Sequence, residues 1–367
     1  MEILSLCMIV KNEEEQIEKC LQSVVDVVDE VIIVDTGSND RTKEICQAYK
    51  AKVYDFPWDG SFASARNFGI RQAKAKWIFW MDADEELEIF DRQSWEDALN
   101  CKKQLMWAVP ILNYIGEYPV DTVKAYHHAQ WRIFRNGLGV KFVNNIHEQL
   151  DISDIRVSPE NIKKLPAVIH HYGYMNAIVE KKDKHQRNLT MLRKEAEQPV
   201  YSAWIDYHLA SEYYRNKEYY KTFDQLNIAI RHFIQEGKIP PSLVYKLKYD
   251  TLLATGSFDG ALAGIDKAIE LYTDYVDLHY YKGILLYEKR HFSQARESFL
   301  HCLSLGEENP QYLILNGVGS FHAMYMIALC DMELNQQERA KNMFERILEL
   351  YPHYSAALQK LEEMRGQ

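Results

Sequence analysis

Residues 77–85 read WIFWMDADE: five apolar residues run into a group of carboxylates that begins with Asp82 and Asp84. A continuous apolar run of this length predicts a strand that is buried on both faces, as in a parallel sheet covered by helices. Ligands of such sheets bind beyond the carboxyl ends of the strands. Two aspartates at i and i+2 of an extended chain point the same way and suit one hard cation. Taken alone, the pair fits a turn followed by a helix cap equally well.

The chain around this strand alternates short apolar runs with amphipathic stretches. An α/β domain on a mostly parallel, Rossmann-like sheet is expected from strands and helices that alternate in this way. The second strand ends in Asp35 before a glycine turn, where its carboxylate can accept a hydrogen bond from a nucleobase N–H. Alternatively, Asp35 only caps the turn. The pattern predicts strands at 3–10, 30–35, 52–55 and 77–81, and helices at 13–25, 40–49 and 62–73.

From about residue 201 the pattern changes to almost continuous helix. Phe258 and Phe292 occupy equivalent positions in two similar segments 34 residues apart, and Ala261 and Ala295 repeat the spacing. This is the period of the tetratricopeptide repeat, in which each helix pair buries its apolar face against its neighbours. A further unit follows an insertion of 11 residues. The predicted domains are a catalytic domain at 1–198, closed by 151–198, and an all-α repeat domain at 199–367.

Composition and missing motifs limit the classes of function. The 367 residues carry a net charge of −10, which argues against nucleic-acid binding by bulk electrostatics. The N-terminal apolar run is too short to span a bilayer, so we expect no integral membrane association. Six scattered cysteines without metal-binding spacing predict reduced thiols and a cytoplasmic location. The sequence has no P-loop and no G-x-G-x-x-G, which argues against P-loop enzymes and Rossmann dehydrogenases.

Four short motifs occur in order along the N-terminal part of the chain: MIVKNEE at 8–14, VDTGSND at 34–40, ARNFG at 65–69 and DAD at 82–84. Together they resemble the family 2 glycosyltransferases of the GT-A fold. The repeats narrow the resemblance to bacterial members with tetratricopeptide tails, similar to peptide glycosyltransferases of the sublancin type and to flagellin-modifying enzymes. One departure is Thr36, which stands where the family usually has a second aspartate.

The resemblance implies an inverting transfer of a sugar from a nucleotide-diphosphate donor, which we expect to be a UDP-sugar, with Mn²⁺ or Mg²⁺ as cofactor. The nucleoside would be held by Asp35 and the end of the first strand. The donor-binding residues that follow from the resemblance are Val10, Asn12, Glu13, Asp35, Arg66, Asn67, Asp82 and Arg132. The implied metal ligands are Asp84, Asp82 and one of two adjacent histidines, for which we expect His170 rather than His171.

An inverting transfer also needs a base on the face of the sugar opposite the leaving diphosphate. The best match to the acidic motif that the family carries downstream is NIHE at 145–148, so Glu148 is the expected base. The alternative is a surface glutamate. Arg132 either pairs with a phosphate, orients the base, or forms a surface ion pair.

Three hypotheses for the acceptor remain open from the sequence. We expect a peptide or protein bound by the repeat domain, because solenoids form extended concave surfaces. The alternatives are a cell-envelope saccharide and an inactive repeat scaffold that only binds a nucleotide sugar. The presence of Asp82, Asp84 and Glu148 argues against the inactive scaffold. Exposed repeats also leave a homodimer open.

Overall fold

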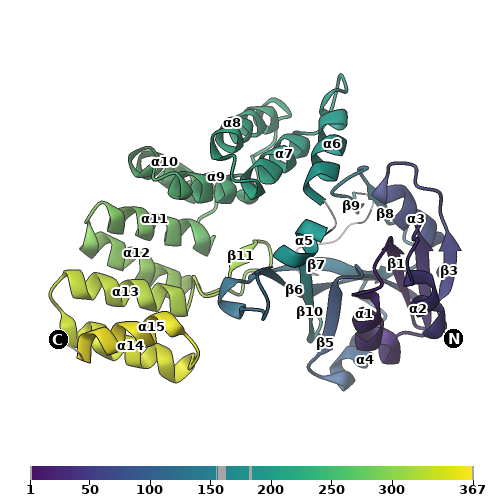
Figure 1. The fold of residues 1–367 in the computed structure, drawn as a ribbon, viewed down its shortest axis with the longest axis horizontal. Coiled ribbons are helices and arrows are strands. Elements are labelled where there is room, and N and C mark those ends of the chain that lie inside the picture. The colour runs from purple at the N-terminus through teal and green to yellow at the C-terminus, as the bar shows by residue number, and fades with distance from the viewer. Residues whose placement is uncertain (1, 154, 156–162, 182–183, 366–367) are drawn as a thin grey trace. The chain divides into compact units, whose positions relative to one another are not determined.

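The computed structural model of the chain describes residues 2–153, 155, 163–181 and 184–365. It contains two compact units (Figure 1). The first consists of residues 1–121 and 127–184, and the second of residues 122–126 and 185–367. No helix within the described residues is both long and apolar enough to cross a membrane.

The first unit is an α/β domain on a mixed, mostly parallel sheet with the strand order β3-β2-β1-β4-β7-β6-β10-β5 (Figure 1). Strands β3, β2, β1 and β4 are parallel neighbours, as are β6 and β10, whereas β7 is antiparallel to β4 and β5 to β10. The strands are β1 (Leu4–Val10), β2 (Glu30–Asp35), β3 (Lys52–Asp55), β4 (Trp77–Trp80), β5 (Glu85–Ile89), β6 (Met106–Gly116), β7 (Tyr126–Arg135), the separate pair β8 (Lys141–Val143) and β9 (Gln149–Asp151), and β10 (Ala167–Met175).

Strand β4 explains why the run at 77–81 is apolar throughout. Trp77 and Phe79 are buried in a core that includes α1 and α4, and Ile78 is buried in a second core on the other face, next to α3. Both faces of a central strand are covered by helices, so no position along it favours a polar side chain. The helices of this unit are α1 (Ile17–Val24), η1 (Val25–Val27), α2 (Thr42–Ala48), α3 (Phe62–Gln72), α4 (Arg92–Asn100) and α5 (Asn176–Lys181).

The predicted strands and helices of the first 81 residues are present, with one shift at α1. We predicted a helix from residue 13, whereas α1 begins at Ile17. Asn12 has a left-handed φ of 55°, and the backbone N–H of Glu13 donates to the hydroxyl of Thr42 at 2.7 Å. A turn tied to the start of α2 therefore takes up the residues that the amphipathic pattern assigned to the helix.

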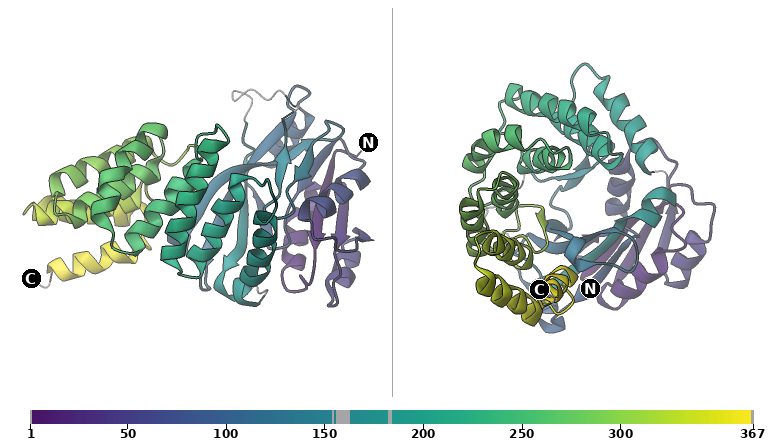
Figure 2. Two further views of the ribbon diagram at one scale, coloured as in Figure 1. Left: turned by 90° about the horizontal axis from the view of Figure 1, so that it is seen from above. Right: turned by 60° about the vertical axis from the view of Figure 1, so that its left-hand side comes forward.

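The second unit is built from helix pairs, as the 34-residue period predicted (Figures 1 and 2). Ala261 in α10 and Ala295 in α12 are both fully buried. At Gly283 in α11, a Cβ atom would lie 2.6 Å from the ring of Phe299, so the two helices approach closely only because this residue is glycine. The helices are α6 (Lys184–Ala196), α7 (Ala203–Arg215), α8 (Tyr219–Gln235), α9 (Ser242–Ala254), α10 (Phe258–Leu271), α11 (Val276–Glu288), α12 (Phe292–Leu305), α13 (Phe321–Glu333), α14 (Gln337–Leu350) and α15 (Ser355–Arg365).

The predicted insertion in the repeats lies between α12 and α13 and contains strand β11 (Ile314–Leu315). The carboxylate of Glu307 accepts hydrogen bonds from the backbone N–H groups of Gly317 at 3.0 Å and Gly319 at 2.7 Å. Two charge-assisted bonds to one side chain give this loop a defined shape.

The insertion binds residues 122–126, which include helix η2 (Thr122–Lys124) and belong to the same compact unit. The side-chain amide of Asn316 donates to the Thr122 carbonyl at 2.7 Å, and its backbone N–H donates to the Ala125 carbonyl at 2.9 Å. The insertion in the repeats thus forms hydrogen bonds with the backbone of residues 122–126. No pattern in the sequence indicated this contact.

Replacing Asn316 with alanine should therefore loosen residues 122–126. Loss of one such bond costs about 1 kcal/mol, so local opening, and with it tryptic cleavage after the exposed Lys124, should become roughly 5-fold faster. Cleavage of the native protein is followed by mass spectrometry. The matched control is Asn309→Ala, because Asn309 lies on the same insertion but bonds to Asp274. Equal cleavage rates in the two variants would contradict the assignment.

Candidate active site

Strands β1, β2 and β4 end side by side, and Asp35 stands at the end of β2. Its side chain is buried, and Oδ1 accepts hydrogen bonds from the backbone N–H groups of Gly37 at 3.0 Å and Ser38 at 2.9 Å. Its Oδ2 is also buried but has no partner. One oxygen of Asp35 therefore caps the turn, as one interpretation of the sequence predicted, and the nucleobase contact stays a prediction.

The end of β1 forms the wall beside Asp35. The backbone N–H of Asn12 donates to the Ser38 hydroxyl, and the Asn12 side chain accepts from the N–H of Asn39, both at 2.9 Å. Thr36 bonds the carbonyl of Val10 through both its backbone N–H and its hydroxyl, at 3.0 and 3.1 Å. The residue that departs from the family pattern thus joins the ends of β1 and β2.

Arg66 of α3 brings two predicted carboxylates together. Its Nη2 donates to Asp82 and its Nε to Glu148, both at 2.6 Å, and its guanidinium lies 4.8 Å from the centre of the Trp80 ring. Burial alone would lower the pKa of Arg66, but Asp82 and Glu148 outweigh burial and raise it. In turn, burial would raise the pKa of Asp82, but Arg66 and Arg132 outweigh it and lower that pKa. Both groups of the Arg66–Asp82 pair are therefore charged.

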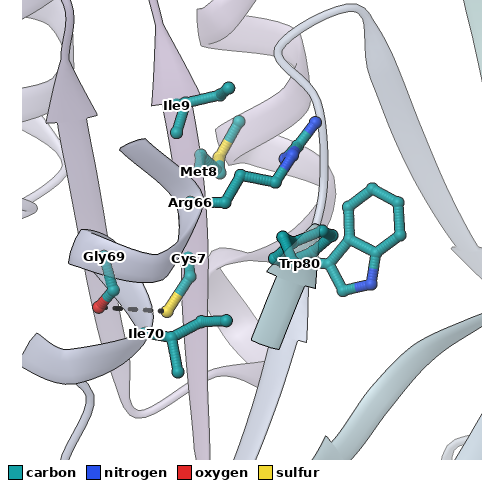
Figure 3. A pocket seen from close by; sticks show the side chains of 8 residues that line it. Cys7, Met8, Ile9, Arg66, Gly69, Ile70 and Trp80 are labelled. Atoms are coloured by element: carbon teal, nitrogen blue, oxygen red, sulfur yellow. Dashed lines mark hydrogen bonds between the residues drawn. The ribbon is translucent and has the colours of Figure 1, made fainter. Parts of the chain in front are cut away.

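A small pocket opens beside this ion pair. Figure 3 shows Arg66 between Met8 of β1 and Trp80, and the third guanidinium nitrogen, Nη1, is buried without a partner. A buried donor without a partner is costly unless a ligand or water accepts from it. The pocket is lined by Cys7, Met8, Ile9, Arg66, Gly69, Ile70, Trp80 and Phe142.

Asn67 and Arg132 are engaged by the protein itself. The Asn67 amide bonds both the N–H and the carbonyl of Phe142, each at 2.8 Å, and so holds the start of the β8–β9 pair. Arg132 donates to Glu85 from two nitrogens, at 2.6 and 3.1 Å, and stacks 3.7 Å from the centre of the Trp80 ring. Arg132 forms a buried ion pair rather than the surface pair that we considered, and its Nε, like Nη1 of Arg66, is buried without a hydrogen-bond partner.

The two adjacent histidines of β10 point to opposite faces of the sheet. His171 Nε2 lies 3.6 Å from Asp84 Oδ1, and both side chains are largely buried. His170, which we expected at the metal site, bonds the Tyr114 hydroxyl at 2.8 Å and Glu88 at 2.9 Å instead. Alternation along a strand forces this separation, because neighbours point to opposite faces. The structure therefore places His171, and not His170, next to Asp84.

Glycine at position 173 leaves room for this pair. A Cβ atom there would lie 2.5 Å from His171 Nε2 and 2.7 Å from Asp84 Oδ2. Burial by itself would lower the pKa of His171, but Asp84, Glu85 and Asp82 outweigh burial and raise it. The carboxylate of Asp84 and the ring of His171 are thus packed closely together against Gly173.

The donor set suits a divalent cation in part. No group of three or more His, Cys, Asp or Glu side chains poised to hold a metal occurs among the described residues, so the predicted trio of Asp84, Asp82 and His170 is not assembled. Asp82 is engaged by Arg66. Two ligand atoms on one cation at about 2.1 Å lie roughly 3–3.6 Å apart, which the separation of Asp84 and His171 satisfies. Asp84 and His171 would supply two of the ligands that a divalent cation needs.

Several residues of the site were missed in the sequence. Trp80 and Glu85 lie within residues 77–85, where Trp80 ends the buried strand β4 and Glu85 follows it, so their positions give a usable signal. Asn113 of β6 and His128 of β7 carry no local signal at all. They reach the site only through strand pairing, which single-sequence patterns do not define.

Comparison with known proteins agrees with this architecture. The family described as Glycosyl transferase family 2 matches residues 5–91, and Tetratricopeptide repeat matches residues 322–354. The chain is 29% identical over 280 residues to a TPR repeat-containing protein of Synechococcus elongatus. The aligned region covers 73% of this chain and 66% of that protein. It is 26% identical over 350 residues to the SPbeta prophage-derived glycosyltransferase SunS of Bacillus subtilis, covering 91% of this chain and 78% of SunS.

A third relative is the lipopolysaccharide core biosynthesis glycosyltransferase LpsC of Rhizobium meliloti, 30% identical over 142 residues, or 37% of this chain and 52% of LpsC. The match to LpsC covers a smaller share of the chain than the matches to the other two relatives. The chain is therefore similar to family 2 glycosyltransferases in its N-terminal part and to tetratricopeptide repeats near its C-terminal end.

Proposed function

We propose that this chain transfers a sugar, with inversion, from a UDP-sugar to a side chain of a peptide or protein, in a reaction that depends on Mn²⁺ or Mg²⁺. The observation that carries the proposal is the buried pair of Asp84 and His171 beside the Arg66–Asp82–Glu148 network. At one sheet edge, Asp84 and His171 would hold the cation and Glu148 would supply the carboxylate that acts as base. This is the edge at which ligands of such sheets bind.

The free oxygen of Asp35 supports a uridine donor. A buried carboxylate oxygen without a partner is costly, and the N–H of a uracil ring supplies the missing donor. The Val10, Asn12 and Glu13 segment forms the adjoining wall, because its backbone is bonded to the loop after β2. Asp35 is thus the residue proposed to select a nucleobase that has a ring N–H to donate over a nucleobase that lacks one.

Replacing Asp35 with asparagine should weaken UDP binding without unfolding the protein. The amide oxygen still accepts from the turn, whereas the amide NH₂ now meets the donor N–H of the base. Loss of a hydrogen bond to a charged group costs about 1.5–3 kcal/mol, or roughly 10- to 100-fold in the dissociation constant measured by calorimetry. Asp55→Asn is the matched control, since Asp55 is paired in register with Asp35 but is exposed and bonded to Lys43. Unchanged affinity in Asp35→Asn would refute the base contact.

Asp84 and His171 are the residues proposed to hold the cation. A cation there would neutralise the charge that develops on the leaving diphosphate. A nitrogen ligand next to carboxylate and phosphate oxygens favours Mn²⁺ over Mg²⁺, although both accept such oxygen ligands. Arg66, which is fully charged, holds Asp82 beside this position and offers Nη1 to an anion.

Glu148 is the proposed base. Its bond to Arg66 leaves one carboxylate oxygen for the acceptor, and it fixes the direction in which that oxygen points. The acceptor S–H or O–H gives its proton to Glu148 while its heteroatom bonds the anomeric carbon. The bond from that carbon to the diphosphate breaks on the opposite face, and UDP leaves with the electron pair. The configuration of the sugar is inverted by this single displacement.

The repeats are proposed to bind the acceptor. Tetratricopeptide repeats are protein-interaction modules, and their stacked helices suit an extended peptide. The name of LpsC keeps a saccharide acceptor as the alternative. All six cysteines are free thiols, which supports a reducing compartment such as the cytoplasm.

The proposal is tested with the full chain and a panel of UDP- and GDP-sugars, with and without Mn²⁺. The expected result is Mn²⁺-dependent binding of one UDP-sugar by calorimetry, with slow release of UDP. Peptide and lipopolysaccharide-core acceptors are then compared for sugar transfer by mass spectrometry. Binding of no donor would refute the transferase, and transfer only to the saccharide would refute the peptide acceptor.

A further inference from the structure

A chain of polar side chains leads away from the proposed metal site. Asn113 of β6 and His171 of β10 are direct neighbours in the parallel register of these strands. Asn113 is buried, and its Oδ1 lies 2.8 Å from His171 Nδ1. Its Nδ2 lies 3.1 Å from Nδ1 of His128 on β7. Three adjacent strands, β7, β6 and β10, therefore each supply one member of the chain.

His128, the last of these three polar side chains, orients the side chain of Asn113. Burial, together with the nearby Arg132 and His171, lowers the pKa of His128 to about 3. His128 is therefore neutral under ordinary conditions, so one of its ring nitrogens is an acceptor. The Asn113 NH₂ group meets Nδ1 of the His128 ring, so Nδ1 is the accepting nitrogen, and the Asn113 carbonyl oxygen faces His171.

An amide oxygen only accepts hydrogen bonds, so the nitrogen of His171 that meets it must carry the proton. In the neutral ring, a proton on Nδ1 leaves the lone pair on Nε2. That nitrogen is the one 3.6 Å from Asp84. Without Asn113, the carboxylate of Asp84 would favour the opposite tautomer, in which Nε2 carries the proton and cannot bind a cation.

We infer that Asn113 is a positioning residue, oriented by His128, that holds His171 with its Nε2 lone pair directed at the site of the divalent cation. The inference rests on the proposed function in so far as a cation binds at Asp84 and His171. The tautomer itself is a property of the metal-free chain and is measured without any ligand.

The first test is ¹⁵N NMR of the full chain with labelled histidine, at alkaline pH where His171 is neutral. The expected result is protonation of His171 at Nδ1 in the wild type and in Asn113→Asp, whose carboxylate also accepts from Nδ1. Asn113→Leu removes the acceptor, so His171 should shift to protonation at Nε2. A wild-type ring protonated at Nε2, or the same tautomer in all three proteins, would overturn the inference.

The second test is the Mn²⁺ affinity of the same proteins by calorimetry. Loss of a residue that orients a histidine ligand typically weakens metal binding about 10- to 100-fold, so Asn113→Leu should bind Mn²⁺ more weakly by that factor. His170→Gln is the matched control, because His170 is adjacent in sequence but is bonded to Tyr114 and Glu88 on the other face. Its affinity and the His171 signal should equal those of the wild type.

The two tests separate the two claims. If His171→Gln and Asp84→Ala bind Mn²⁺ as tightly as the wild type, the proposed metal site is wrong, whatever the NMR result. If both variants lose Mn²⁺ while Asn113→Leu keeps wild-type affinity, the metal site stands and the role of Asn113 is refuted. If leucine at position 113 prevents folding, the wild-type protein still decides, because a His171 ring protonated at Nε2 would refute the inference.

Discussion

Replacing Asp84 with alanine should lower the rate of sugar transfer by roughly 10²- to 10³-fold, because a cation at a leaving group supplies about 3–4 kcal/mol of transition-state stabilisation. Its side chain is largely buried next to His171, whereas the carboxylates of Asp82 and Glu85 pair with Arg66 and Arg132. The rate is measured as UDP release at saturating donor, and Mn²⁺ affinity is measured in parallel by calorimetry.

Alanine substitutions at Asp84 and at its neighbour Asp82 should differ in their effect on the free energy of unfolding. Removing Asp84 relieves repulsion from nearby carboxylates, so we expect a change in the free energy of unfolding within about 1 kcal/mol. Removing Asp82 strips a buried arginine of one partner, which costs about 3 kcal/mol or more. Asp82→Ala should therefore lower both stability and activity. An Asp84→Ala variant with normal turnover would show that the cation site lies elsewhere.

Replacing Glu148 with glutamine should reduce kcat by roughly 10²- to 10⁴-fold, the usual contribution of a general base, while the KM for the donor stays near the wild-type value. The amide oxygen of glutamine still accepts from Arg66 Nε, whose distance to the native carboxylate is 2.6 Å, so the ion-pair network loses a charge but keeps its geometry. Steady-state kinetics with one peptide acceptor gives both constants.

Glu148→Ala is the informative control for that prediction. It leaves Nε of a buried arginine without a partner, so its melting temperature should fall below that of Glu148→Gln, although both variants lack the base. If glutamine retains turnover, Glu148 only supports Arg66, and the base must be sought among other residues. If donor affinity falls together with kcat, a structural role is indicated instead.

Local patterns were sufficient for the order of the N-terminal elements and for the repeats. The run at 77–81 became β4 because a central strand between two cores must be apolar at every position. The 34-residue spacing placed Ala261 and Ala295 at equivalent buried positions, because each repeat packs in the same way on the next. The helix expected from residue 13 was too long, since an amphipathic pattern does not show where a turn is held by a distant hydroxyl.

The candidate site was predicted less completely, for the same physical reason. Arg66 and Glu148 are 82 residues apart in sequence and meet through a side-chain bond that no local pattern encodes. Arg132 was a donor-binding candidate from the sequence, yet its partner Glu85 became evident only when β7 was seen beside β4.

The sequence by itself determined the α/β class, the strand-end aspartates, the family resemblance and the repeat period, because these depend on hydrophobic periodicity and short motifs. Tertiary structure alone decided that His171 and not His170 meets Asp84, and that Asn113 and His128 stand behind it. Adjacent residues of a strand point to opposite faces, so a choice between neighbours depends on register. That register is set by strand partners that lie far away in the chain.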